Sequence, residues 1–414
     1  MAQERMTRRD AQHVGIRVEY LFGPIRVPSR EAFVEALATI VRETPLLRVG
    51  ADISPDRRRR ISRRDRAAEW AESAVETIPG DGLENFVTGF GPRVSAPPSP
   101  AAMHFTLTDR HVLFSGDHSL GDSGILMRMA PAVIAVADGE PVPDWLMRPE
   151  PRRALSRAVW HTLGMRPRAW RAALAAGSPA VEQPQEPELR PWTPDPRIST
   201  STITNERFGE LRRAYKKDSA RVPATIALMA VARAALEAES IDVKPLTWVP
   251  IDARRYLPDG VDLVGNFAPP VPVSAGRGDS AVAMSEQLAR SVDSGRPLLS
   301  MVLSSLRPAH RAAAPLAVPV RPRADVVVTT VGIRQEVDGL PWQDRRDSWF
   351  FGATAPGNDP LAICIAIAPT RCGATITASY HGNVFSPRRI DDALARLATG
   401  DVGELVERYA LRAA

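Results

Sequence analysis

The sequence predicts an α/β protein built as two lobes. At 414 residues, the chain is long enough for two domains of ordinary size. Apolar residues make up 44% and charged residues 24% of the chain, which is the balance of a globular protein with a sizeable core. Each half is expected to contain both helices and strands, and a proline- and arginine-rich linker at about 141–197 separates the halves. We therefore expect an N-terminal lobe over residues 1–180, ending within this linker, and a C-terminal lobe over 198–414.

The first half is expected to open with a strand at Val14–Leu21. A helix then begins at Ser29, whose hydroxyl is suited to cap free N–H groups, and ends before Pro45. The apolar residues of this helix share one face: they are Phe33, Leu37, Ile40 and Val41. Strands at Leu46–Ile53 and at 57–64 follow. The basic run Arg57–Arg60 is either a solvated edge, where charge blocks edge-to-edge pairing, or a contact for phosphate.

Two strands, Ala102–Thr108 and His111–Gly116, come next, and the second leads directly into the sequence DHSLGDSG at 117–124. A helix is expected from about Gly124 to Ala137. This step from strand to loop to helix places polar side chains at the end of a strand, where a ligand can reach them.

The linker contains an amphipathic stretch, Leu155–Leu174, that carries Trp160 and Trp170. Two interpretations stay open. Either both tryptophans pack on the body of the protein, or the stretch lies on a membrane or on a partner.

The second half is expected to contain helices and strands in alternation. The expected helices are Thr204–Lys217, Val222–Glu239, most of 280–310 and Pro387–Ala398. The expected strands are Leu246–Ile251, Val271–Val273, Ala324–Thr330, Leu361–Ala368 and Ala374–His381.

The pair His118 and Asp122 is the strongest candidate for chemistry. Histidine is the side chain whose ordinary pKa lies near neutrality, so it suits a general base. A carboxylate four residues later can brace the loop or pair with an arginine. Gly121 and Gly124 allow a tight turn and a close approach to a ligand. Taken alone, the spacing is also common for a histidine with a purely structural role.

Several other classes of protein are disfavoured. Cys364 and Cys372 form no CxxC pair, and the histidines show no HExxH pattern, so we expect no metal site. There is no P-loop and no GxSxG motif, and GDSG at 121–124 lacks the upstream histidine region of serine proteases. A net charge of +5 is modest for nucleic-acid binding. The N-terminus lacks an apolar signal region and no apolar stretch reaches the ~20 residues of a membrane span, so we expect a cytoplasmic protein without an integral membrane segment.

The layout resembles the condensation-domain and chloramphenicol-acetyltransferase-like acyltransferase superfamily, including polyketide-associated acyltransferases. The resemblance covers nearly the whole chain and rests on segments in the expected order. These are TPLLR at 44–48, FSGDHSLGDSGILM at 114–127, similar to HHxxxDG, the Val222–Leu236 helix, VPIDAR at 249–254, VGN at 264–266, Val327–Gly332, and Thr375–His381 with its terminal helix.

The resemblance implies two chloramphenicol-acetyltransferase-like α/β lobes in a V with a central tunnel, where an acyl thioester and an acceptor meet. His118 matches the base that deprotonates the acceptor. Asp122 matches a structural aspartate, and Arg254 is its expected partner. Gly121 N–H, Thr329 and Thr330 are the candidates for stabilising the oxyanion.

The resemblance therefore implies an HxxxD-type acyltransferase that transfers groups other than aminoacyl groups and acts in natural-product or lipid biosynthesis. Acyl-CoA or acyl-phosphopantetheine would be the co-substrate, and no permanently bound cofactor is expected. The resemblance does not assign the residues that bind this co-substrate. An acyl carrier protein is a possible partner, nucleic acid is not expected, and we expect a monomer.

Departures from the pattern keep an alternative open. Asp117 replaces the first histidine of HHxxxDG, and Ser123 replaces its glycine. No DFGWG box is evident, and SWFFG at 348–352 is a loose match. The alternative is a condensation-fold protein that has changed its reaction to a cyclisation or rearrangement, or that acts as a carrier-protein docking module.

Overall fold

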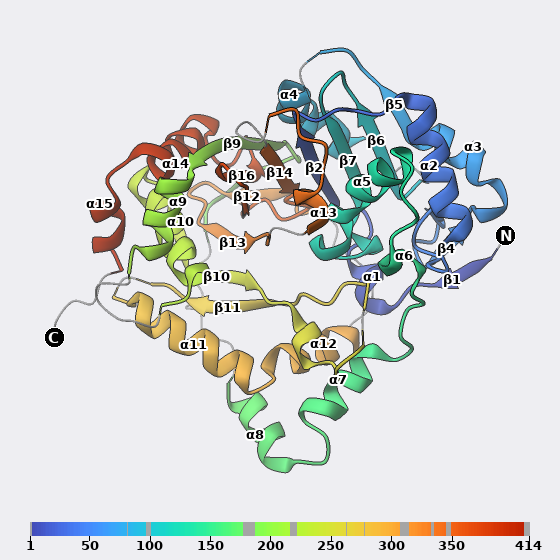
Figure 1. Cartoon of the computed structure of the whole chain (residues 1–414). Coiled ribbons are helices and arrows are strands. Elements are labelled where there is room, and N and C mark those ends of the chain that lie inside the picture. The colour runs from blue at the N-terminus through green and yellow to red at the C-terminus, as the bar shows by residue number, and fades with distance from the viewer. Residues whose placement is uncertain are drawn as a thin grey trace.

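The computed structural model describes residues 2–80, 82–96, 101–176, 187–215, 222–261, 263–276, 278–306, 314–332, 335–344 and 349–409. It shows two α/β lobes side by side, each with a central sheet flanked by helices (Figure 1). The predicted fold class, an α/β protein of two lobes, is confirmed.

The N-terminal lobe is built on a five-stranded sheet in the order β14-β2-β7-β6-β5. The strands are β14 (Trp349–Thr354), β2 (Arg17–Gly23), β7 (Val112–Asp117), β6 (Met103–Leu107) and β5 (Val75–Thr77). The main helices are α2 (Arg30–Glu43), α3 (Ala67–Ala74), α4 (Gly82–Ser95) and α5 (Ser123–Ala137). A small sheet, β1 (Gln3–Arg5), β4 (Arg59–Ser62) and β3 (Ala51–Ile53), and the short helix α1 (Arg8–Gln12) complete this lobe. Of these elements, α1 contacts the C-terminal lobe, where Arg8 donates to the carbonyl of Ser305.

The C-terminal lobe is built on a six-stranded sheet in the order β11-β10-β13-β15-β16-β9. The strands are β11 (Pro270–Ser274), β10 (Val243–Pro250), β13 (Ala324–Thr330), β15 (Ala362–Pro369), β16 (Gly373–His381) and β9 (Pro196–Thr204). Its helices are α9 (Asn205–Arg213), α10 (Ala224–Ala238), α11 (Ala281–Asp293), α12 (Arg296–Leu306), α14 (Pro387–Thr399) and α15 (Val402–Glu407). The central strands β10, β13 and β15 run parallel, whereas their outer neighbours are antiparallel.

Short elements connect these parts. They are α6 (Asp144–Met147), α7 (Ala154–Thr162), α8 (Pro167–Ala175), α13 (Gln335–Asp338) and the ribbon of β8 (Leu189–Pro191) with β12 (Ala317–Pro319).

The two cores differ in composition. The core of the N-terminal lobe contains a run of buried phenylalanine rings, with Phe105 in edge contact with both Phe33 and Phe114. The core of the C-terminal lobe is mainly aliphatic and centres on α10, which is buried on nearly every face from Ile226 to Leu236. A helix that is apolar all round belongs in an interior, and the alanine-rich sequence of α10 lets its neighbours pack closely.

One strand crosses between the lobes. Although β14 comes late in the chain, it pairs antiparallel with β2, from Trp349 opposite Gly23 to Thr354 opposite Val18. On its other side it is tied to the second sheet, since the Thr375 hydroxyl donates to the carbonyl of Phe350 at 2.6 Å. A division of the chain at residue 198 therefore does not separate the two sheets.

Most of the expected elements are present. The Ser29 hydroxyl accepts from the N–H of Ala32, so the predicted cap of α2 is confirmed. The strand expected at Leu46–Ile53 was too long, because the chain turns at 47–50 and pairs only from Ala51. The strand expected at Val14–Leu21 begins at Arg17, after α1.

Several elements were not predicted, or were predicted with different bounds. The helices α3 and α4 and the strands β9 and β14 were missed. The stretch 155–174 is two helices, because the chain turns after Thr162 and a proline, Pro167, begins α8. Residues 216 and 217, at the expected end of one helix, and Ser348 of the SWFFG segment lie outside the described residues.

The two tryptophans of the linker are buried to different extents. Trp170 is half-buried and its indole N–H donates to the carbonyl of Gly164 at 3.0 Å. Trp160 is 67% exposed, so the interpretation that both pack on the body is wrong for this residue. Among the described helices, none is both long and apolar enough to span a membrane.

Replacing Phe350 by alanine should lower the free energy of unfolding by about 3–5 kcal/mol. The ring is 1% exposed and stacks on Phe22 with centroids 5.6 Å apart, so its removal leaves a cavity in the N-terminal core. Urea denaturation measures the change. Leu174→Ala, on an exposed helix face, is the control and should shift stability by no more than about 0.5 kcal/mol. Equal small changes in both variants would show that β14 does not contribute to this core.

Candidate functional site

The candidate loop connects β7 to α5. Its residues 118–120 form a single 3₁₀ turn, and Asp122 then caps α5 by accepting from the N–H of Gly124 at 3.1 Å. Gly121 has a φ of +157°, and a Cβ there would lie 2.2 Å from the Ile125 side chain and 2.9 Å from the Val264 carbonyl. Only glycine fits at this position, because both its backbone conformation and its surroundings exclude a side chain.

The imidazole of His118 is partly exposed. Its ring stacks on that of His13, with centroids 4.6 Å apart and planes at 18°. The backbone N–H of His118 donates to the carbonyl of Ile16 at 2.8 Å. Its Nδ1 atom is buried and has no hydrogen-bond partner among the described residues. The ring is therefore held in orientation by stacking, in a residue that is not fully buried.

Asp122 and Arg254 join the two lobes. The guanidinium donates to both carboxylate oxygens, from Nη1 to Oδ2 at 2.9 Å and from Nη2 to Oδ1 at 3.2 Å. The Phe267 N–H also donates to Asp122 Oδ2 at 3.0 Å, and Arg254 further donates to the carbonyls of Leu263 and Gly265. Burial lowers the pKa of the Arg254 guanidinium, but Asp122 and Asp252 together raise it by more. Such a forked, charge-assisted pair fixes geometry as well as charge.

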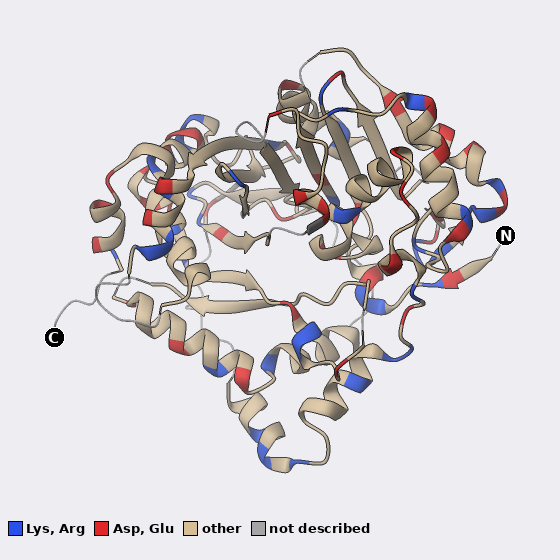
Figure 2. Cartoon of the chain, viewed as in Figure 1, with Lys and Arg blue, Asp and Glu red and all other residues tan. Residues whose placement is uncertain are grey.

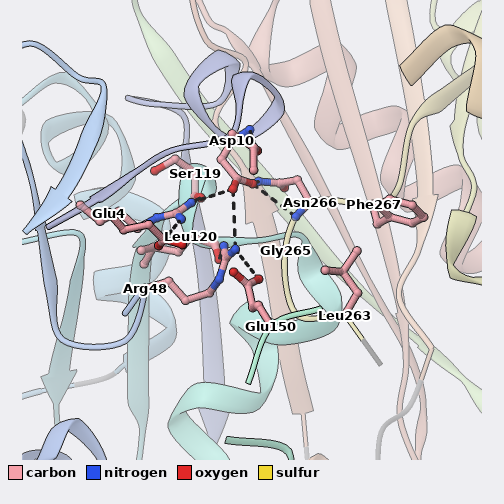
Figure 3. A network of polar contacts seen from close by, with 12 residues as sticks. Glu4, Asp10, Arg48, Ser119, Leu120, Glu150, Leu263, Gly265, Asn266 and Phe267 are labelled. Atoms are coloured by element: carbon pink, nitrogen blue, oxygen red, sulfur yellow. Dashed lines mark hydrogen bonds and ion pairs between the residues drawn. The ribbon is translucent and has the colours of Figure 1, made fainter. Parts of the chain in front are cut away.

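A second ionic network lies behind the loop and centres on Asp10 (Figure 3). This carboxylate is 2% exposed and accepts from Arg60 at 2.9 Å and from the Asn266 side chain at 3.0 Å; Arg48 lies 3.6 Å away. Burial alone raises the pKa of Asp10, but Arg48, Arg60 and the Asn266 hydrogen bond together lower it by more, so the pKa lies well below its usual range. Arg48 is also paired with Glu150 at 2.5 Å. The buried charges are thus balanced by neighbours.

The same side chains hold the backbone of the candidate loop. Each of the three carbonyls of the 3₁₀ turn accepts from one member of the network: His118 from Asn266 at 2.8 Å, Ser119 from Arg60 at 2.6 Å, and Leu120 from Arg48 at 2.5 Å. Since Asn266 comes from the second half of the chain, both lobes fix the position of His118.

Comparison with known proteins identifies the fold. No family model matches the chain and no curated protein matches its sequence. Among solved structures, the condensation domain of the monacolin K polyketide synthase MokA is 10% identical with a TM-score of 0.63, over 99% of both chains. The trichothecene 15-O-acetyltransferase TRI3 from Fusarium sporotrichioides is 12% identical with a TM-score of 0.62, over 99% of this chain and 96% of that one. The chain has the condensation-domain fold.

A further structure with this fold is polyketide synthase associated protein 5 from Mycobacterium tuberculosis, at 13% identity and a TM-score of 0.57, over 95% of this chain and 96% of that one.

In this chain the residue before His118 departs from HHxxxDG, and the structure shows what Asp117 does. Its carboxylate accepts from the N–H of Gly15 at 2.7 Å and from that of Ser119 at 2.9 Å. Asp117 thereby anchors the segment that carries His13 to the candidate loop.

The three oxyanion candidates are placed differently. The Gly121 N–H donates to the carbonyl of His118 at 3.3 Å, so it is engaged within the turn. Thr329 and Thr330 end β13, and the Thr330 hydroxyl is buried without a hydrogen-bond partner among the described residues. In the part of the chain that the structure describes, no hydrogen bond joins either threonine to the candidate loop.

Sequence reasoning missed the residues that position the loop. The run Arg57–Arg60 was expected to be solvated or to contact phosphate, yet Arg60 is 1% exposed and faces Asp10. The available signal was the position of Arg60 in a strand, since alternate residues face opposite sides. Arg48 and Asn266 belong to segments on which the resemblance rests, but no sequence pattern assigned either residue a role in the site. Nothing in the sequence marked Asp10 or His13.

The described residues contain no group of three or more His, Cys, Asp or Glu placed to hold a metal ion. A cavity of about 700 Å³ lies in the C-terminal lobe between α8, β11, α11 and α12. Its lining does not include the candidate loop, so it belongs to a different part of the molecule.

Arg254→Ala should destabilise the protein by about 3–5 kcal/mol, because it leaves the buried Asp122 carboxylate without its counter-charge. Arg255→Ala, at the exposed neighbouring position, is the matched control and should change stability by no more than about 0.5 kcal/mol. Adding Asp122→Asn to Arg254→Ala should recover part of the loss, since no unpaired charge remains. Chemical denaturation measures all three. A loss no larger than that of the control would contradict a structural role for the pair.

Acid should weaken the fold through Asp10. Its pKa in the folded protein lies below the value of 3.8 of an ordinary aspartate, so on acidification the unfolded chain takes up this proton first. The stability due to Asp10 is present above pH 4 or so and is lost as the pH falls further. Denaturation at a series of pH values should give a shallower acid slope for Asp10→Asn than for the natural chain. Identical slopes would refute this contribution.

Proposed function

We propose that the protein is an acyltransferase that moves an acyl group from a thioester of coenzyme A or of a carrier protein to a hydroxyl or amine. The observation that carries this proposal is a partly exposed imidazole, His118, on a loop whose carbonyls are held from both lobes. Likeness in fold to condensation domains and to an acetyltransferase supports the class of reaction.

In the proposed reaction His118 acts as general base. It takes the proton of the acceptor hydroxyl or amine while the acceptor oxygen or nitrogen attacks the thioester carbonyl. The tetrahedral intermediate collapses, the carbon–sulfur bond breaks, and the proton passes from the imidazolium to the leaving thiolate. Asp122 and Arg254 are positioning residues, since they shape the loop without touching the reacting atoms.

The negative charge on the carbonyl oxygen needs a hydrogen-bond donor. Of the three candidates, Thr330 is favoured because its buried hydroxyl has no partner among the described residues, whereas the Gly121 N–H is engaged with His118. Thr329 remains the second candidate. Losing one such donor typically costs about 10²–10³ in rate.

The proposal includes a tunnel between the lobes in which donor and acceptor meet, and positioning there would supply much of the rate. It also includes a cytoplasmic monomer that uses the donor as co-substrate, with an acyl carrier protein as a possible partner, in natural-product or lipid biosynthesis.

A second function is favoured by Asp117. The first histidine of HHxxxDG is replaced by a carboxylate that is committed to holding Gly15 and Ser119. The same fold could therefore perform a cyclisation or rearrangement of a carrier-bound product, or bind a carrier protein without catalysis.

Transfer from a panel of acyl thioesters to hydroxyl and amine acceptors, followed by mass spectrometry, tests the proposal. His118→Ala should lower kcat/KM by about 10²–10⁴, the usual contribution of a general base, with an unchanged unfolding curve. His111→Ala, just before the opposite end of β7, is the matched control and should retain activity. Transfer at the natural rate by His118→Ala would refute the mechanism. No transfer by the natural protein, combined with binding of acyl carrier protein, would favour the second function.

A further inference from the structure

Helices α7 and α8 form a hairpin that projects from the rest of the molecule (Figure 1). From residue 151 to residue 176 this segment contains no aspartate or glutamate and six arginines, all of them exposed: Arg152, Arg153, Arg157, Arg166, Arg168 and Arg171. Figure 2 shows basic residues on both helices without an acidic one. The hairpin is thus strongly positive, although the whole chain has a net charge of only +5.

Large apolar side chains are exposed between these arginines. Trp160 is 67% exposed, Met165 in the turn is 82% exposed and Leu174 is 59% exposed. Scattered exposed apolar residues are ordinary on a protein surface. Three such residues in one short basic segment are a local concentration with a specific chemistry.

Both helices turn the same kinds of residue outward. On α7 the buried positions are Ala154 and Ala158, and Arg157 and Trp160 lie together at i, i+3 on the exposed side. On α8 the buried position is Ala173, and Arg171 and Leu174 repeat that pairing. We define the arginine–tryptophan face as the exposed residues Arg157, Trp160, Met165, Arg168, Arg171 and Leu174.

We propose that the arginine–tryptophan face docks on the surface of an anionic lipid membrane. Charge complementarity selects this occupant, because guanidinium groups bind lipid phosphates and carboxylates while their stems lie along apolar surface. Tryptophan is the side chain best suited to the boundary between headgroups and acyl chains. Each helix has nine residues, so the hairpin lies on the membrane and does not cross it.

This inference goes beyond acyl transfer and does not depend on it. Its energetic basis is additive: each arginine near an anionic surface contributes a factor of about five in partitioning, through about 1 kcal/mol of attraction. The attraction is screened by salt. Insertion of one tryptophan adds a further factor of about ten or more.

Sedimentation of the full chain with lipid vesicles tests the proposal. Binding is expected to vesicles of phosphatidylcholine with phosphatidylserine, not to phosphatidylcholine alone, and should weaken as salt is added. Arg168→Glu combined with Arg171→Glu should lower the partition coefficient by at least about 25-fold, a factor of about five for each arginine lost, and Trp160→Ser by about tenfold. Arg213→Glu combined with Arg388→Glu, which makes the same charge change on exposed parts of α9 and α14, is the control and should lower binding far less.

Three outcomes would overturn the proposal. They are no binding to the anionic vesicles, equal binding to both kinds of vesicle, and equal loss in the hairpin variant and its control. Binding of an acidic protein such as acyl carrier protein to this face, without vesicle binding, would also overturn it and assign the face to a protein partner. Circular dichroism of each variant checks that the helices are retained.

Discussion

The buried carboxylate of Asp10 is the constraint on which the candidate site depends. It lies between two arginines and an asparagine, and those three side chains hold the three carbonyls of the turn that carries His118. Buried charge adds little net stability when it is well paired, but removing one partner leaves the others uncompensated. The network therefore specifies one conformation of the loop, and the role of general base that we propose for His118 requires such a fixed position.

The two lobes are joined by two kinds of contact, one at the candidate loop and one between the sheets. One is ionic, between Asp122 and Arg254; the other is structural, through the strand β14, which pairs with β2 and contacts the second sheet. The strand β2 precedes His118 in the sequence and Asp122 follows it, and each of them contacts a segment from the second half of the chain. The position of the imidazole therefore depends on the whole fold.

The sequence was sufficient for the fold class, for the cap at Ser29 and for the strand–loop–helix step around His118. Resemblance also placed Arg254 opposite Asp122. It was not sufficient for Arg60 or Asp10, because the burial of a charge depends on which distant residues neutralise it, and no local pattern contains that information. The strand β14 was missed for a related reason: its partner, β2, lies more than three hundred residues earlier in the chain.

The crossing strand has a consequence for any attempt to produce the lobes as separate proteins. A fragment that stops at the linker would leave β2 as a bare edge, with a row of unpaired N–H and carbonyl groups beside Phe22 and other apolar side chains. Such an edge recruits strands from other molecules. The isolated first lobe should aggregate, whereas a fragment co-expressed with a peptide covering 349–354 would have its missing edge restored.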